Sequence, residues 1–173
     1  VDVSGGAIFD WGSHFIDQIL AIMPGEIASV TGINQKRMWN HVTNADHADV
    51  SITFTDGARA LFTNSDLAAA RKPKFYVLGT KGAIVGNWDP AAGSVPADLP
   101  AILTIYRADG SSQVIPNSVV APYSFHQSVV AYLNNKIPMN VTTHQSRDVV
   151  AIMQAAEESA LANGHPVKPV LLR

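Results

Sequence analysis

Apolar residues recur every three or four positions between Ile8 and Met23, and Pro24-Gly25 follows directly. Positions at this spacing share one face of a helix, so the pattern predicts an amphipathic helix over Ile8–Met23. The Pro-Gly pair is expected to end it, because neither residue continues a helix well. Residues 1–6, which are rich in small residues, are expected to form a loop.

The middle of the chain alternates apolar and polar residues, which is the pattern of half-buried strands. The alternation is clearest at Val50–Thr55, where Asp56-Gly57 and the apolar segment Ala58–Phe62 complete a hairpin signal. Further strands are expected at Glu26–Gln35, Lys74–Leu78, Ala83–Val85, Ala101–Tyr106 and Gln113–Ile115. Lys36–Asp49 is polar and is expected to be a long connection, and Asn87–Pro100 an exposed excursion.

Helical spacing returns in the last third of the chain. One helix is predicted over Pro122–Asn135, and another from Thr142, which forms a capping box with Gln145, to Asn163-Gly164. Pro166–Leu172 is expected to be a terminal strand. The order of elements predicts an α+β fold, with helices packed on one face of an open, mainly antiparallel sheet.

Composition narrows the possible partners. The chain has 173 residues, which permits one domain of the common size of roughly 150 residues. Its 12 Lys+Arg against 14 Asp+Glu leave a formal net charge of −2, so no nucleic-acid partner is expected. No apolar run reaches the roughly 18 residues that span a bilayer, so no membrane partner is expected. The absence of cysteine fits a reducing compartment, and a cytoplasmic location is expected.

Three polar residues of the first predicted helix share one narrow stripe. At about 100° per residue, Asp10, His14 and Asp17 lie within roughly 60° of one another and opposite the large apolar side chains. Two carboxylates beside an imidazole suit general acid/base chemistry, because a carboxylate one turn away can orient a histidine that exchanges protons near neutral pH. The alternative is an ordinary solvated helix face. Short Asp side chains and Gly12 are costly inside a helix, and Gly12 indicates close packing or a nearby ligand.

Other motifs carry weaker signals for bound groups. His41, Asp46, His47 and Asp49 match no closed zinc spacing and are equally well explained by a polar loop, so no metal is expected. Gly79–Gly82 is too short for a dinucleotide-binding loop and lies between predicted strands, so no cofactor-binding residue is assigned in this chain.

The opening motif resembles that of a known family. It reads Gly-Gly-x-x-x-Asp-x-Gly-x-His-x-x-Asp, at Gly5, Gly6, Asp10, Gly12, His14 and Asp17. It is similar to the motif that opens the C-terminal domain of the Gfo/Idh/MocA oxidoreductases, the family of glucose-fructose oxidoreductase and inositol dehydrogenase. The Asp56-Gly57 hairpin, the Gly79–Ala83 turn and the late Ala155–Ala160 segment are also similar to the family pattern.

The resemblance implies a fold like the C-terminal domain of glyceraldehyde-3-phosphate dehydrogenase, and an NAD(P)-dependent activity on a sugar, polyol or related hydroxyl or carbonyl substrate. By this resemblance Asp10 and His14 are catalytic, beside the nicotinamide, and move the hydroxyl proton of the substrate. Asp17 is assigned to substrate binding. The catalytic lysine of the family's Glu-Lys-Pro motif has no counterpart here, so no lysine is assigned.

The resemblance also implies a missing half. Family members carry an N-terminal Rossmann domain, which would bind NAD or NADP, so residues 1–173 are expected to be a single substrate-binding and oligomerisation domain that is inactive alone. In the family, the open face of the sheet pairs subunits, and a homo-oligomer is therefore expected. The alternative function is a non-catalytic oligomerisation module of the same family.

Overall fold

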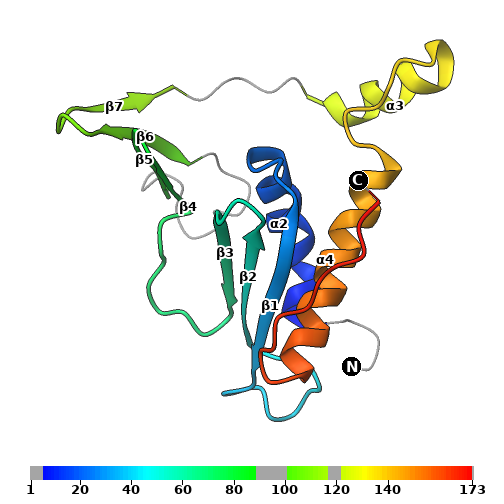
Figure 1. Cartoon of the computed structure of the whole chain (residues 1–173). Coiled ribbons are helices and arrows are strands. Elements are labelled where there is room, and N and C mark those ends of the chain that lie inside the picture. Colours follow the sequence, from blue (N-terminus) through cyan, green and yellow to red (C-terminus); the bar gives the residue numbers. More distant parts are fainter. Residues whose placement is uncertain (1–5, 89–100, 117–121, 173) are drawn as a thin grey trace. The chain divides into compact units, whose positions relative to one another are not determined.

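The computed structural model describes residues 6–88, 101–116 and 122–172 (Figure 1). Within it the chain forms two compact units. The first unit comprises residues 1–68 and 127–173, and the second unit comprises residues 69–126. Most of the predicted loop at the start of the chain, and most of the predicted excursion before Pro100, lie outside the described residues.

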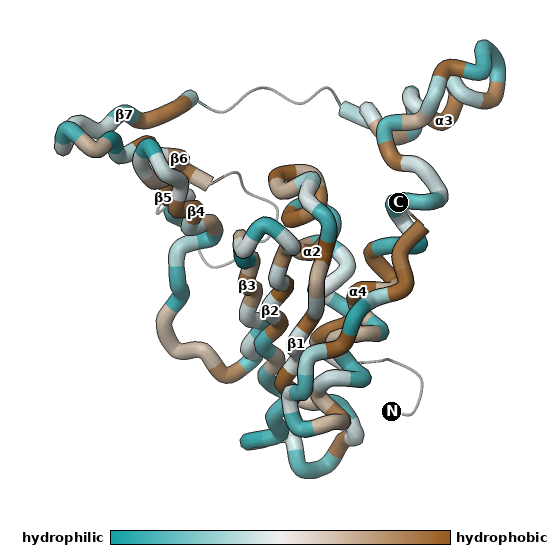
Figure 2. The backbone as a smooth tube through the Cα atoms, in the orientation of Figure 1, coloured by the Kyte–Doolittle hydropathy of each residue, from teal (hydrophilic) through white to brown (hydrophobic). Residues whose placement is uncertain are grey.

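The first unit contains a three-stranded antiparallel sheet in the order β1-β2-β3. Its strands are β1 (Ile27–Gln35), β2 (His47–Phe54) and β3 (Arg59–Ser65). Hydrophilic and hydrophobic residues alternate along β2 (Figure 2), and every second residue of β2 from Ala48 to Phe54 is buried. The predicted hairpin is confirmed: Gly57 adopts φ 89°, and the Asp56 carboxylate accepts a bond of 2.9 Å from the Ala58 N–H.

Three helices of the first unit are α1 (Gly6–Asp10), α2 (Gly12–Ile22) and α4 (Thr143–Leu161). The single helix predicted over Ile8–Met23 is therefore wrong at one point, because the structure interrupts it at Trp11. The Trp11 carbonyl accepts from the N–H groups of both His14 and Phe15, at 3.1 Å each, so the backbone is tightened at this joint.

Of the two explanations offered for Gly12, close packing or a nearby ligand, the structure supports packing. Gly12 is buried, and an added Cβ would lie 3.4 Å from Cζ of Phe62 on β3. The surrounding core joins the inner face of the sheet to α1, α2 and α4, and α4 runs beside β1 (Figure 1). The core side chains with essentially no exposure include Ile8, Ile16, Val30, Val50, Ile52, Ile152 and Ala156. Burial of this shared apolar face holds the first unit together.

The ends of α4 agree with the sequence prediction. The capping box is complete, since the Gln145 N–H donates to Thr142 Oγ1 at 3.2 Å and the Thr142 N–H to Gln145 Oε1 at 2.7 Å. After Leu161 the backbone turns through Asn163 and Gly164, which both have positive φ.

The terminal strand predicted at Pro166–Leu172 is wrong. This segment forms only an isolated bridge, between Val167 and Val30. Two other backbone groups of the segment are bound by side chains of α4: Arg147 donates to the Val170 carbonyl at 3.0 Å, and the Leu172 N–H donates to Asp148 at 2.9 Å. The two prolines of the segment also lack the N–H that a strand ladder needs.

The second unit contains a four-stranded antiparallel sheet in the order β4-β5-β6-β7. Its strands are β4 (Phe75–Gly79), β5 (Gly82–Asn87), β6 (Ile102–Arg107) and β7 (Ser112–Ile115). The remaining helix, α3 (Ser124–Asn135), has residues in both units. The α+β class and its antiparallel strands are confirmed, and among the described residues each unit has a sheet of its own where the sequence analysis expected one sheet. Within the described residues, no helix has the length and apolar character to cross a membrane.

Candidate functional site

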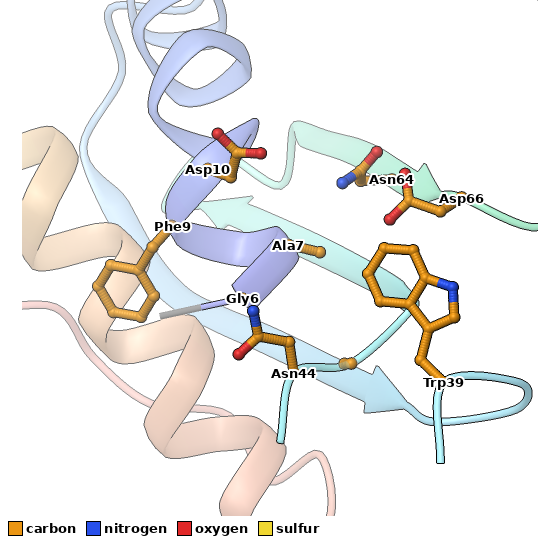
Figure 3. Close-up of a pocket in the computed structure, with 9 residues that line it drawn as sticks. Gly6, Ala7, Phe9, Asp10, Trp39, Asn44, Asn64 and Asp66 are labelled. Carbon is orange, nitrogen blue, oxygen red and sulfur yellow. The ribbon is translucent and has the colours of Figure 1, made fainter. Parts of the chain in front are cut away.

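An open pocket of about 570 Å³ lies in the first unit, where α1 approaches the connection between β1 and β2 and the end of β3 (Figure 3). Its lining residues are Gly6, Ala7, Phe9, Asp10, Trp39, Asn44, Ala45, Asn64 and Asp66. The polar groups that it offers are two carboxylates, two primary amides and one indole, so it can both donate and accept hydrogen bonds.

Helix α1 supplies one wall of the pocket. Ala7 and Ile8 are buried in the core, which anchors this short helix against the sheet. Asp10 is the last residue of α1 and is exposed. Figure 3 shows Asp10 on the same side of the helix as Asn64 and Asp66 of the opposite wall.

The connection between β1 and β2 supplies the opposite wall, and Asp46 organises it. The Asp46 carboxylate accepts bonds from the backbone N–H groups of Arg37 at 3.0 Å, Met38 at 2.6 Å and Trp39 at 2.8 Å. Burial raises the pKa of the Asp46 carboxyl, but these backbone bonds outweigh it and hold the pKa below its ordinary value. The connection ends earlier than predicted, because β2 begins at His47.

Asp66 is the second carboxylate of the pocket. Asp66 is exposed, and partial burial together with the negative charges of Asp10 and Asp46 raises its pKa above the ordinary value. A positive charge or a hydrogen-bond donor placed between Asp10 and Asp66 would relieve this repulsion. The pocket therefore favours ligands that donate hydrogen bonds, such as hydroxyl groups.

Replacing Asp66 with Asn is expected to increase the free energy of unfolding modestly at neutral pH. The raised pKa means that the folded state prefers protonated Asp66, so the stability this group contributes is complete at acidic pH and is lost as pH rises through that raised pKa. The gain from Asp66→Asn should therefore shrink as pH falls. Urea unfolding at several pH values measures it. Asp17→Asn, at an exposed position outside the pocket, is the control, and equal pH dependence of both variants would contradict the assignment.

The structure places only one of the three predicted site residues in this pocket. Asp10 lines it, whereas His14 and Asp17 lie on α2, are exposed and do not line it. The His14 ring lies beside the Trp11 ring, with centroids 5.8 Å apart. In the described part of the chain, no hydrogen bond or ion pair joins the side chains of Asp10 and His14.

The residues considered as a possible metal site in the sequence, among them Asp46, His47 and Asp49, lie in two different environments. Asp46 is buried and binds backbone N–H groups, as above. His47 pairs with Asp49 on β2, Nε2 to Oδ2 at 3.1 Å, and Asp49 also accepts from the Thr63 hydroxyl of β3. Among the described residues, no three His, Cys, Asp or Glu side chains are grouped to hold a metal ion.

The pocket residues do not fit a dinucleotide. The charged groups of the pocket are carboxylates, which repel phosphates, and no cationic side chain is among the described residues that line the pocket. Dinucleotide sites instead present backbone N–H groups at a glycine-rich helix N-terminus to the pyrophosphate.

Trp39, Asn44, Asn64 and Asp66 were not among the residues predicted from the sequence. A usable signal exists for Asp66. In the hairpin of β2 and β3, His47 pairs with Ser65, so extending the register by one residue brings positions 46 and 66 together. The Asp66 N–H indeed donates to the Asp46 carbonyl at 3.1 Å. Two aspartates at the open end of a predicted hairpin are therefore a detectable pattern.

Comparison with known proteins agrees with the resemblance that the motifs indicate. The family model described as the GFO/IDH/MocA C-terminal domain matches residues 1–85. A curated relative, scyllo-inositol 2-dehydrogenase (NADP(+)) IolW of Bacillus subtilis, is 21% identical over 171 residues, covering 90% of this chain and 47% of the relative. The chain thus spans about half the length of that curated relative.

Solved structures share the fold. An NAD-binding protein from Listeria innocua has a TM-score of 0.74 at 23% identity, with 95% of this chain and 48% of that chain covered. A proposed oxidoreductase from Klebsiella pneumoniae has a TM-score of 0.78 at 23% identity, with 98% and 51% covered. These likenesses confirm the predicted resemblance to the Gfo/Idh/MocA oxidoreductases: residues 1–85 match the family model of the C-terminal domain, and the fold is shared with the solved structures over nearly the whole chain.

Proposed function

We propose that this chain is the substrate-binding domain of a longer NAD(P)-dependent oxidoreductase that acts on a sugar, polyol or related hydroxyl or carbonyl compound. The pocket beside α1 carries the proposal. Its carboxylates and amides suit a ligand that bears many hydroxyl groups, and the Trp39 indole offers a flat apolar surface for the C–H face of a ring.

Asp10 and His14 are the proposed acid/base pair. Oxidation of an alcohol requires removal of its hydroxyl proton, and a carboxylate or an imidazole within hydrogen-bond reach can take it. Asp10 lies in the pocket at the end of α1, and His14 follows on α2, beyond the interruption at Trp11. Asp17 is proposed to contact substrate further along the same helix. These roles rest on the family resemblance, and the position of Asp10 supports them.

The proposed whole protein has a second domain. The relatives are about twice as long as this chain, and two are named for NADP(+) or for NAD binding. We therefore propose that residues 1–173 are one functional domain and that an N-terminal Rossmann domain binds NAD or NADP. The nicotinamide supplies hydride transfer, and this chain binds substrate and moves the proton. The chain alone is expected to be inactive.

Turnover by the longer protein tests this function. The longer protein should reduce NAD or NADP when at least one polyol of a panel of cyclic and linear polyols is present. Scyllo-inositol belongs to the panel because the curated relative is named for it. The appearance of reduced nicotinamide is the measurement. Failure with every polyol and sugar of the panel, by protein that binds the dinucleotide, would contradict the proposal.

A homo-oligomer formed through the second unit is also proposed. Tyr76, Leu78, Tyr106 and Val114 share one face of its sheet by register, and they are 64%, 71%, 44% and 60% exposed. Exposed apolar surface of this kind is typical of an interface between subunits. Sedimentation of the 173-residue chain at micromolar concentration measures its oligomeric state, and a strict monomer would contradict the proposed interface.

A further inference from the structure

Asp46 is a fully buried aspartate, with 0% of its surface exposed, at the junction between the β1–β2 connection and strand β2. It does not line the pocket, yet its neighbours Asn44 and Ala45 do. Burying a carboxylate costs free energy of folding unless its oxygens accept hydrogen bonds. The groups that donate to Asp46 therefore indicate its structural role.

The contacts of Asp46 reach both sides of the pocket wall. Its carboxylate accepts from the backbone N–H groups of Arg37, Met38 and Trp39, which bends this segment around one side chain. Its own N–H donates to the Gln35 carbonyl at 3.1 Å, and its carbonyl accepts from the Asp66 N–H at 3.1 Å. Two pocket residues, Trp39 and Asp66, are thus held by hydrogen bonds to the same residue.

The Trp39 indole depends on this arrangement. In the described part of the chain, its ring takes part in no aromatic pair and its Nε1–H has no hydrogen-bond partner. The backbone that carries the indole is held by the Asp46 carboxylate, which accepts from the Trp39 N–H at 2.8 Å. Its free N–H is available to donate to a ligand oxygen.

We propose that Asp46 is a positioning residue of the pocket: it fixes Trp39 and Asp66 so that both can contact a hydroxyl-rich ligand. The inference rests on the proposed function of the pocket. Asp46 touches no ligand itself and acts through the residues it holds. Loss of its carboxylate leaves three backbone N–H groups without an acceptor, so the segment from Arg37 to Trp39 rearranges and the indole moves.

Two substitutions test this role in the longer protein. Asp46→Ala removes both carboxylate oxygens, and Asp46→Asn replaces one of them with an amide NH₂ group and serves if the alanine variant does not fold. Asp109→Asn is the matched control, because Asp109 also binds a turn, accepting from the Ser111 N–H at 2.8 Å, but belongs to the second unit. KM for the polyol of the panel that the longer protein oxidises is expected to rise by roughly tenfold or more in the Asp46 variants, with a smaller change in kcat, since misplaced binding groups weaken substrate binding.

Indole NMR signals separate this role from a general loss of stability. The chain has three tryptophans, and Trp→Phe variants assign their Nε1–H signals. Asp46→Asn is expected to shift the Trp39 signal and to leave that of Trp88, in the second unit, in place, whereas Asp109→Asn leaves the Trp39 signal unchanged. An unmoved Trp39 signal, or an unchanged KM, overturns the proposal.

The unsubstituted protein provides a further readout that needs no ligand. The amide hydrogens of Met38 and Trp39 are expected to exchange slowly although they lie outside helices and strands, because Asp46 binds them. Rapid exchange at both overturns the inference. Failure of the wild-type protein to oxidise any polyol counts against the proposed function, while the indole signal and amide exchange still decide whether Asp46 positions Trp39.

Discussion

Replacing Asp10 with Asn or His14 with Ala in the proposed longer oxidoreductase is expected to lower kcat for the proposed polyol substrate by roughly 10²- to 10⁴-fold, the usual contribution of a general acid or base. Asp10 lies in the pocket at the end of α1, and His14 is the next ionisable residue along the chain, on α2. Steady-state turnover with saturating NAD or NADP measures the effect. Neither substitution is expected to unfold the protein, because both side chains are exposed.

The matched control for this experiment is His144→Ala. His144 is also an exposed histidine on a helix of the first unit, α4, and it does not line the pocket. Its loss is expected to leave turnover within about twofold of wild type, as is common for surface substitutions away from a site. If His14→Ala retains the turnover of His144→Ala, His14 is not the acid or base, and the same comparison decides for Asp10.

Gly32→Ala is expected to be the most destabilising small substitution in the first unit. Gly32 lies in β1 beneath α4, and an added Cβ would fall 2.0 Å from the carbonyl oxygen of Ala156. The obstacle is helix backbone, which cannot rotate away as a side chain can. The change would also disturb the buried bond of 3.0 Å from the Gly32 N–H to Ser159 Oγ. We expect a loss of about 3 kcal/mol or more in the free energy of unfolding, measured in urea.

Gly12→Ala is the control for this effect. Gly12 is buried as well, but its added Cβ would make an ordinary contact of 3.4 Å with the Phe62 side chain. Alanine also raises helix propensity, by up to about 1 kcal/mol. The variant should therefore stay close to wild-type stability. Equal destabilisation at both glycines would show that the approach of α4 to β1 is not the limiting contact.

Local patterns predict the elements of this fold well. The Asp56-Gly57 turn and the alternation in β2 depend on residues close in sequence, and so does the capping box of Thr142 and Gln145. The errors have tertiary causes. The break at Trp11 accompanies close packing of Gly12 on β3, and the segment after Pro166 binds to α4 instead of extending along the sheet.

The candidate site was only partly predictable for the same reason. Asp10 stands out because it is part of a helical stripe and of a family motif. Trp39 and Asp66 come to line the same pocket as Asp10 only because the β1–β2 connection folds around Asp46 and the hairpin brings positions 46 and 66 together. Sequence spacing alone contains no signal for the bend at Arg37–Trp39, because its acceptor follows seven or more positions later in an irregular segment.

A crystal structure of the longer protein with its dinucleotide and a polyol tests the central claim most directly. The pocket beside α1 is predicted to hold the polyol, with a hydroxyl within hydrogen-bond distance of Asp10 and the ring against the Trp39 indole. A polyol bound elsewhere, with Asp10 and Trp39 both out of contact with it, would contradict the account.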